Sequence, residues 1–235
     1  MSHAAAEDRP FEGRDDYGNF DANLQFLETA GPLPARARVL EIGSGKGRLL
    51  RRLIESGYDA RGIEINADMV AESRRLHGAL PLQQVTGAAL PFPDASFDAV
   101  LSFDVFEHIA DSDAHLREVA RVLVPDGQYL LQTPNKWTNT VFETIRWRSL
   151  TAWRADHCAL HSYRQIIRRF RRHGFATTFY RIPVVTEFFR WKVRRYLGPP
   201  GLALLAVVNP DRLPMPLRTN FYVKAVRLKA DTTSN

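Results

Sequence analysis

Three glycines directly after a short apolar run constrain the fold of this chain more than any other feature. The run is Arg38 to Ile42, and the glycines are Gly43, Gly45 and Gly47. A short apolar run that stops at glycine predicts a buried strand, and the apolar spacing after the loop predicts a helix that ends near Gly57. A glycine loop between a strand and a helix is typical of doubly wound α/β folds, in which a ligand approaches the loop backbone.

Strand-like and helix-like segments alternate through the rest of the chain, which predicts a parallel sheet covered by helices. We expect further strands at Ala60 to Ile65, Leu82 to Thr86, Phe97 to Phe103, Gln128 to Thr133, Phe175 to Ile182 and Asn220 to Leu228. The predicted helices between them are Ala67 to His77, Asp113 to Leu123 and Tyr163 to Phe170. The segments Asn135 to His161 and Pro183 to Thr219 break this repeat, and long irregular connections are usually lids or binding elements.

Composition limits the class of protein. With 235 residues, of which 45% are hydrophobic and 25% charged, the sequence predicts a globular protein with one sizeable core. Its single cysteine, Cys158, cannot form an internal disulfide. The longest apolar runs have about seven residues, far fewer than the ~20 of a membrane span, and the N-terminus lacks the apolar segment of a secretory signal. We therefore expect a cytoplasmic protein.

Basic residues are concentrated in one part of the chain. The formal net charge is +6, yet residues 146–195 contain thirteen Arg or Lys against two acidic residues. Such a segment indicates a surface that meets an anionic partner, or a set of solvated helix faces.

Two acidic residues indicate which ligand the glycine loop holds. Glu41 lies just before the loop, where a carboxylate would repel a pyrophosphate but suits a ligand with an ammonium and a sulfonium group. The loop also reads G-x-G-x-G, with Arg48 where a dinucleotide motif has its third glycine. Glu64 ends the second predicted strand, where an acid binds ribose hydroxyls. These features disfavour, without excluding, an NAD-dependent oxidoreductase on the same fold.

Residues 38–134 resemble the class I S-adenosylmethionine-dependent methyltransferases, in particular the methyltransferase type 11-like family. Besides the glycine loop, the resemblance rests on Gly62 to Met69, Leu90 to Asp98, Phe103 to Ile109 and Val122 to Asn135. It implies a Rossmann-like doubly wound seven-stranded sheet with an antiparallel last strand, and S-adenosyl-L-methionine as the cofactor. Residues 1–36 would form an N-terminal lid or helix, with Tyr17 and Phe20 closing over the donor or packing on the sheet. Residues 37–235 would form the methyltransferase domain, with insertions at about 135–161 and 183–219.

The resemblance also implies a donor site, residue by residue. Its cofactor-binding residues are Glu41, Gly43, Ser44, Gly45, Gly47, Glu64, Ile65, Met69, Ala88, Ala89 and Phe103. The first two would serve the methionine half, Glu64 the ribose, and Ile65 and Met69 the adenine. Many relatives have an acid after the third strand, where this chain has Thr86, so this threonine or the backbone would contact the adenine amino group.

Glu107 and His108 are the candidate catalytic residues, because they follow the fourth strand at the edge where acceptors bind in open α/β folds. An imidazole has a suitable pKa for a general base, although the pair could instead orient the helix that follows. His157, Cys158 and His161 lack a second ligand pair at metal spacing, so we expect no metal site. The same stretch is predicted to form a rim of the acceptor pocket.

The two insertions carry the clues to the acceptor. Both are rich in aromatic and basic residues, which suits a cap over a hydrophobic pocket, peripheral membrane contact through residues 146–208, or stacking on nucleic-acid bases. We expect O-methylation of a small hydrophobic, glycosidic or lipid-linked acceptor, anionic ones included. Methylation of a nucleic acid is a weaker alternative because the chain has no recognised RNA-binding motif. A non-catalytic protein that binds S-adenosylmethionine or a membrane is the other.

Overall fold

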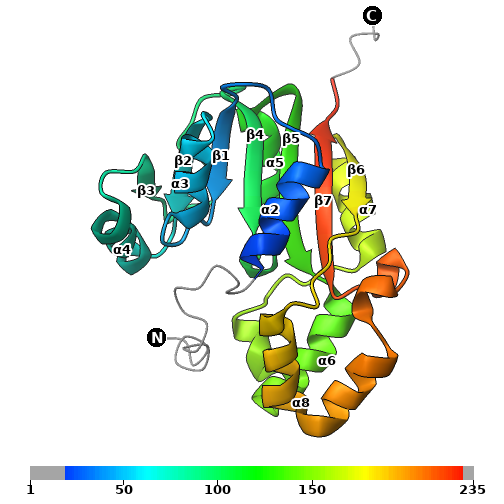
Figure 1. Ribbon diagram of the computed structural model, residues 1–235. Helices are drawn as coiled ribbons and strands as arrows, with labels where there is room; N and C mark the ends of the chain where they lie inside the picture. Colours follow the sequence, from blue (N-terminus) through cyan, green and yellow to red (C-terminus); the bar gives the residue numbers. More distant parts are fainter. Residues whose placement is uncertain (1–18, 230–235) are drawn as a thin grey trace, which may run out of the picture.

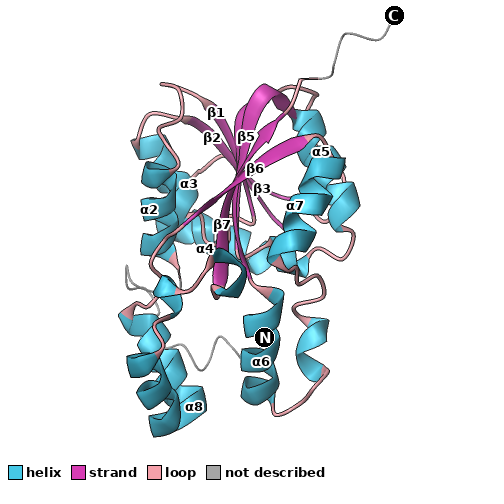
Figure 2. Cartoon of the chain, turned by 90° about the vertical axis from the view of Figure 1, so that its right-hand side faces the viewer, coloured by secondary structure: helices cyan, strands magenta, loops and turns pink. Residues whose placement is uncertain are grey.

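The computed structural model describes residues 19–229 and has one seven-stranded sheet with helices on both faces (Figures 1 and 2). The strand order is β3-β2-β1-β4-β5-β7-β6. The strands are β1 Arg38–Ile42, β2 Asp59–Glu64, β3 Leu82–Gln84, β4 Phe97–Phe103, β5 Leu123–Pro134, β6 Phe175–Tyr180 and β7 Asn220–Arg227. The first five pair in parallel, whereas β7 runs antiparallel to both β5 and β6. This confirms the predicted Rossmann-like sheet with an antiparallel last strand.

Two helical layers bury the two faces of the sheet. Figure 2 shows α2 (Phe20–Thr29), α3 (Arg48–Glu55) and α4 (Ala67–His77) on one side, and α5 (Ser112–Val122) and α7 (Tyr163–Arg172) on the other. Phe26 and Leu50 belong to the first core, Leu116 and Phe170 to the second, and all four side chains are fully buried. Burying apolar surface on both faces of a parallel sheet is what holds such a fold together.

The topology brings three strand ends together. The central strand β1 pairs with β2 on one side and with β4 on the other, so the chain reverses direction across the sheet between β1 and β4. In open α/β sheets, ligands bind outside the carboxyl ends of the strands at such a switch point. Ile42, Glu64 and Phe103 end these three strands.

Beyond the carboxyl ends of the sheet, α6 (Lys136–Trp147) and α8 (Glu187–Val207) form a separate lobe (Figure 1). The prediction of irregular connections here was wrong, because both segments are largely helical. Each helix begins at a side-chain cap: Asn135 accepts from the backbone N–H of Trp137, and Thr186 from that of Phe189. We call α6, the residues that follow it up to Leu150, and α8 the α6–α8 lobe.

Helix α8 bends where Gly198 adopts a positive φ of 62° before two prolines, which cannot continue the hydrogen-bond ladder. Short 3-10 helices complete the connections: η2 Phe106–His108, η3 Ala152–Ala155, η4 Pro210–Arg212 and η5 Met215–Leu217. Within residues 19–229, none of the helices combines the length and the apolar composition that crossing a bilayer requires.

Several boundaries differ from the predicted ones. Strand β3 ends at Gln84 rather than Thr86, because the chain turns there to form part of a cavity wall. Strand β5 begins at Leu123, five residues early, since Leu123 pairs with Phe97 before an irregularity in the β4–β5 register. Strand β6 ends at Tyr180, where pairing with β7 stops, rather than at Ile182.

Candidate active site

The glycine loop needs glycine at two positions for reasons of space. Gly43 has a φ of 76°, and a Cβ there would overlap the side chain of Val105, which follows β4. Gly47 has a φ of 78° at the start of α3, and its Cβ would overlap Ser73 of α4. Side chains at these positions would force apart the loop and its two neighbours. A Cβ at Gly45, by contrast, would meet nothing within 4 Å.

Glu64 connects the glycine loop to the start of α4. Its Oε2 accepts a hydrogen bond from the backbone N–H of Gly45 at 2.8 Å, and its Oε1 accepts from Asn66 at 2.9 Å. Each carboxylate oxygen keeps a lone pair for another donor. The carboxylate is thus fixed beside the loop and can still accept from a hydroxyl group.

Glu41 is a buried carboxylate with an unsatisfied oxygen. Only 6% of the residue is exposed, and its Oε2 has no hydrogen-bond partner among residues 19–229. Burial raises the pKa of Glu41 to about 7, the Ser44 side chain opposes this shift, and the charge of Glu64 adds to it. A buried carboxylate with one oxygen left unbonded fits a ligand that brings a cationic hydrogen-bond donor, such as the ammonium group of S-adenosylmethionine.

A cavity of about 520 Å³ lies at the three strand ends. Five predicted cofactor-binding residues line it: Gly43, Glu64, Ile65, Ala88 and Phe103. The other predicted cofactor-binding residues are outside this lining: Glu41 on β1, Ser44, Gly45 and Gly47 in the glycine loop, Met69 on α4, and Ala89. Sequence reasoning selected Glu107 and His108 after β4 but missed Asp104, Val105 and Asp111 in the same segment, which also line this cavity. The role of each residue in binding the donor stays a prediction.

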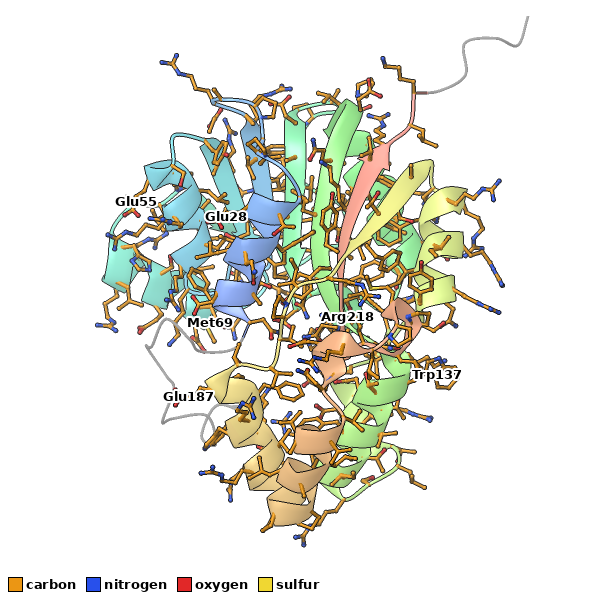
Figure 3. The ribbon with its side chains drawn as sticks, turned by 45° about the vertical axis from the view of Figure 1, so that its right-hand side comes forward. Glu28, Glu55, Met69, Trp137, Glu187 and Arg218 are labelled. Atoms are coloured by element: carbon orange, nitrogen blue, oxygen red, sulfur yellow. The ribbon has the colours of Figure 1, made fainter. Side chains whose placement is uncertain are left out.

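A second cavity, of about 610 Å³, extends from the end of β4 into the α6–α8 lobe. Its walls are mostly apolar and include Trp137, Val141, Ile145, Phe188, Val193, Leu204 and Leu205. Trp137 lies at the outer edge of the lobe (Figure 3). Asp104 and His108 line both cavities, so the two spaces meet at these side chains.

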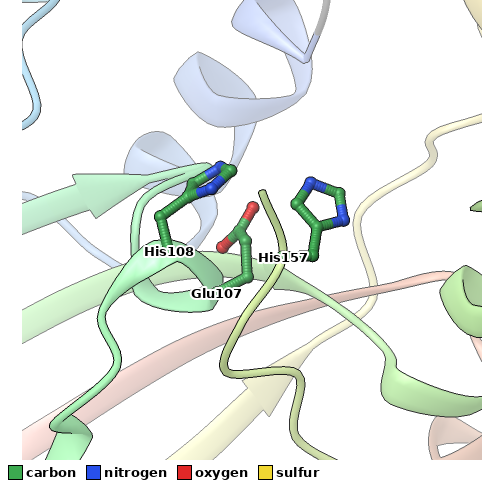
Figure 4. Close-up of side chains that lie close together, drawn as sticks. All are labelled: Glu107, His108 and His157. Carbon is green, nitrogen blue, oxygen red and sulfur yellow. The ribbon is translucent and has the colours of Figure 1, made fainter. Parts of the chain in front are cut away.

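Glu107, His108 and His157 gather where the cavities meet. Figure 4 shows the carboxylate of Glu107 between the two imidazole rings. Glu107 accepts a hydrogen bond from the Thr133 hydroxyl at 2.9 Å, and burial, followed by the charge of Asp104, raises its pKa to about 8. Burial and the neighbouring His108 lower the pKa of His157 to about 4.

Sequence reasoning grouped His157 with the wrong partners. His161 is buried and packs against the ring of Phe106, with ring centroids 5.0 Å apart, and it is not part of the group that His157 forms with Glu107 and His108. Cys158 directs its thiol to the backbone carbonyl of His108 at 3.3 Å. The approach of His157 to Glu107 depends on a contact between distant segments, the hydrogen bond from the Ala159 N–H to the Glu107 carbonyl at 2.8 Å. The spacing of residues in the sequence does not predict this contact.

The described part of the N-terminal segment packs on the sheet. Phe20, at the start of α2, lies under the guanidinium of Arg48, whose central carbon is 3.8 Å from the ring centroid. The Asn19 amide donates to both carboxylate oxygens of Asp104, at 3.2 and 3.1 Å, and so reaches the edge of both cavities. Tyr17 lies outside the described residues, and the proposed lid stays a prediction.

Comparison with known proteins assigns the family. Residues 14–180 match the family model described as a methyltransferase domain. A fatty-acid O-methyltransferase of Mycolicibacterium smegmatis is 35% identical over 127 residues, which cover 52% of this chain and 46% of that protein. A ubiquinone biosynthesis O-methyltransferase of Xanthomonas oryzae is 34% identical over 108 residues, 43% of this chain and 45% of that protein. The chain thus spans less than half the length of these curated relatives.

The crystal structure of YcgJ from Bacillus subtilis has the same fold, with a TM-score of 0.63 and 20% identity over 89% of this chain and 99% of that one. The family match shows that the chain belongs to the methyltransferase domain family, and the sheet and the glycine loop agree with this assignment. This family assignment favours S-adenosylmethionine over NAD as the ligand of the glycine loop, a choice that the loop alone left open.

Proposed function

We propose that the protein transfers a methyl group from S-adenosylmethionine to an oxygen atom of a hydrophobic or lipid-linked acceptor. The observation that carries this proposal is the apolar cavity of the α6–α8 lobe, which meets the cavity at the strand ends at Asp104 and His108. An acceptor with an apolar body and a polar reacting end fits this arrangement, since its body would fill the lobe and its oxygen would reach the junction.

The proposed reaction needs alignment and removal of a proton. Methyl transfer from a sulfonium is an in-line displacement, so the protein mainly holds the oxygen and the methyl carbon in line. The acceptor hydroxyl must also lose its proton. We propose that Glu107 and His108, which lie at the junction, activate this hydroxyl and receive the proton. The Nδ1 of His108 is 2.7 Å from the carbonyl oxygen of Asp156, which can only accept, so Nδ1 carries the hydrogen and Nε2 keeps a lone pair.

Two relatives support an acceptor of this kind. Their names describe O-methylation of a fatty acid and a step of ubiquinone biosynthesis. Nucleic-acid methylation is less well supported, because the cavity that adjoins Glu107 and His108 is apolar.

The direct test is an acceptor panel with release of S-adenosylhomocysteine as the readout. The panel contains long-chain fatty acids, prenylated phenols, short phenols of the same reacting group, and a transfer RNA. We expect turnover with apolar acceptors and a loss of kcat/KM when the apolar tail is shortened. Turnover with the RNA alone, or equal turnover with and without the tail, would contradict the proposal.

Glu41 supplies a prediction about the donor. Replacing Glu41 by Gln removes the buried charge, so we expect weaker binding of S-adenosylhomocysteine but a more stable protein without ligand at pH 8. Because the folded-state pKa of about 7 lies above the ordinary 4.5, burial of the charge lowers stability as pH rises from 4.5 to 7, by at most about 3 kcal/mol. The gain in melting temperature should therefore be large at pH 8 and vanish near pH 4.5. An equal gain at both pH values would show that the charge is not its cause.

We also propose that the outer surface of the α6–α8 lobe contacts a membrane surface. Leu204, Val207 and Leu150 of the α6–α8 lobe are 63%, 85% and 75% exposed, and Arg148 and Arg195 of the same lobe are exposed too. Apolar residues flanked by basic ones suit an anionic bilayer interface.

The test is co-sedimentation with vesicles that contain an anionic phospholipid. We expect Leu204→Glu with Val207→Glu to weaken binding at least tenfold, since each buried apolar side chain contributes about 1.5–3 kcal/mol. Leu76→Glu is the matched control, because Leu76 is exposed on α4 at the far side of the sheet. Equal losses in the control and the double variant, or no binding by the wild type, would refute the contact.

A further inference from the structure

The cluster of Glu107, His108 and His157 has the composition of a metal site. The ligand atoms of the three side chains all lie within 4.8 Å of one another. They come from η2 and from the segment after η3, and hydrogen bonds from Ala159 and Cys158 to the carbonyls of η2 hold the two segments together. Two imidazoles and one carboxylate form a donor set that catalytic zinc sites use.

Each of the three side chains is held by a further group on its other side. The Thr133 hydroxyl donates to the Glu107 carboxylate at 2.9 Å, and the Asp156 carbonyl accepts from Nδ1 of His108 at 2.7 Å. The amide nitrogen of Asn139 lies 2.8 Å from Nδ1 of His157. Turning this amide by 180° would present its oxygen to the ring instead, so that the oxygen accepts the Nδ1 hydrogen and Nε2 keeps its lone pair. Such outer partners fix the orientation of metal ligands.

The charges around the cluster also favour a cation. Glu107 is 2% exposed, and the carboxylates of Asp104 and Asp156 act on it electrostatically. A buried carboxylate with two acidic neighbours is costly unless a positive charge accompanies it. The cluster also adjoins the place where the donor and acceptor cavities meet, since His108 lines both.

We propose that Glu107, His108 and His157 bind one divalent cation of the zinc type, and that this cation binds the acceptor oxygen. The proposal rests on the function proposed above and deepens it. With the cation present, Nε2 of His108 is a ligand rather than a general base, and the acidity of the acceptor hydroxyl comes from the metal. The expectation of no metal site, drawn from His157, Cys158 and His161, considered a different set of side chains.

The reaction then balances without any oxidant or reductant. The hydroxyl releases its proton to solvent, and an oxygen lone pair forms the new O–CH₃ bond. The S–CH₃ bond of the donor breaks at the same time, and its electron pair stays on sulfur as S-adenosylhomocysteine. The cation lowers the pKa of the hydroxyl and keeps the oxygen at the junction.

The experiment is a titration of the chelator-treated 235-residue chain with Co²⁺, followed by visible absorption and calorimetry, with Zn²⁺ as competitor. We expect one ion per chain and a spectrum without sulfur-to-metal charge transfer. His157→Ala should weaken binding more than 100-fold, because changes of outer partners alone cost about 10–100-fold. Asn139→Ala should fall within that smaller range. His77→Ala removes a histidine at the end of α4, far from the cluster, and should change nothing.

Three controls keep the outcome clear. Cys158→Ser should leave the Co²⁺ spectrum unchanged, which excludes the nearby thiol as the ligand. Melting temperatures show that each variant is folded. Calorimetry with S-adenosylhomocysteine tests the proposed function separately: binding of that compound without any binding of Co²⁺ or Zn²⁺ overturns the metal site alone. Equal metal affinity of the wild type and His157→Ala also overturns it.

Discussion

Replacing Glu64 by Ala should weaken the binding of S-adenosylhomocysteine at least 100-fold. The carboxylate accepts from the backbone N–H groups of Gly45 and Asn66 and has further lone pairs for the ribose hydroxyls. A hydrogen bond to a charged group contributes about 1.5–3 kcal/mol, so the loss of two ribose contacts alone corresponds to about 100-fold or more. The variant also frees the glycine loop from the start of α4, which adds to the loss.

Calorimetric titration measures this effect, and Asp59→Ala is the matched control. Asp59 is an exposed acid at the opposite end of the same strand, β2, so its removal tests whether any charge change on this strand matters. We expect the control to bind like the wild type. If Glu64→Ala retained its affinity, or if NAD bound in place of S-adenosylhomocysteine, the assignment of the ribose to this carboxylate would be wrong.

The donor side of the fold is predictable because its determinants are local. Gly43 and Gly47 follow a strand within a few residues, and the positive φ that each requires is a property of its own backbone. The alternation of strands and helices likewise fixes the parallel sheet, since each crossover covers one face of it. The family resemblance then supplied the number of strands and the antiparallel last one.

The acceptor side is less predictable because its determinants are contacts between distant segments. Helix α8 contains Gly198, Pro199 and Pro200, which read as breakers, yet the bend they cause lies within one helical segment. His157 reaches Glu107 only because the segment after η3 pairs with η2 across 50 positions of sequence. Spacing rules for metal ligands apply within one segment, and so they directed attention to His161 instead.

Replacing Glu107 by Gln should lower kcat about 10²–10⁴-fold, the range that loss of a group acting on the transferred proton produces. The substitution keeps the size of the side chain and an oxygen that can accept from Thr133, so it removes the ionisable carboxyl group and little else. Binding of S-adenosylhomocysteine should be unchanged, because Glu107 lines the acceptor cavity and not the cavity at the strand ends. The same fall in kcat is expected whether Glu107 acts with a base or as a ligand of the proposed cation.

The matched control is Glu143→Gln, which removes a second buried carboxylate from the wall of the same cavity. Glu143 accepts from the indole N–H of Trp147 and lies in an ion pair with Arg146, away from the junction with the donor cavity. Its loss should change KM for the acceptor more than kcat, since it would affect binding rather than proton removal. Steady-state kinetics with an apolar acceptor found in the panel separates the two outcomes. Unchanged kcat in a folded Glu107→Gln enzyme would show that Glu107 takes no part in the reaction. Comparable losses of kcat in both variants would show that the loss reflects a general change in the cavity wall rather than a specific role of Glu107.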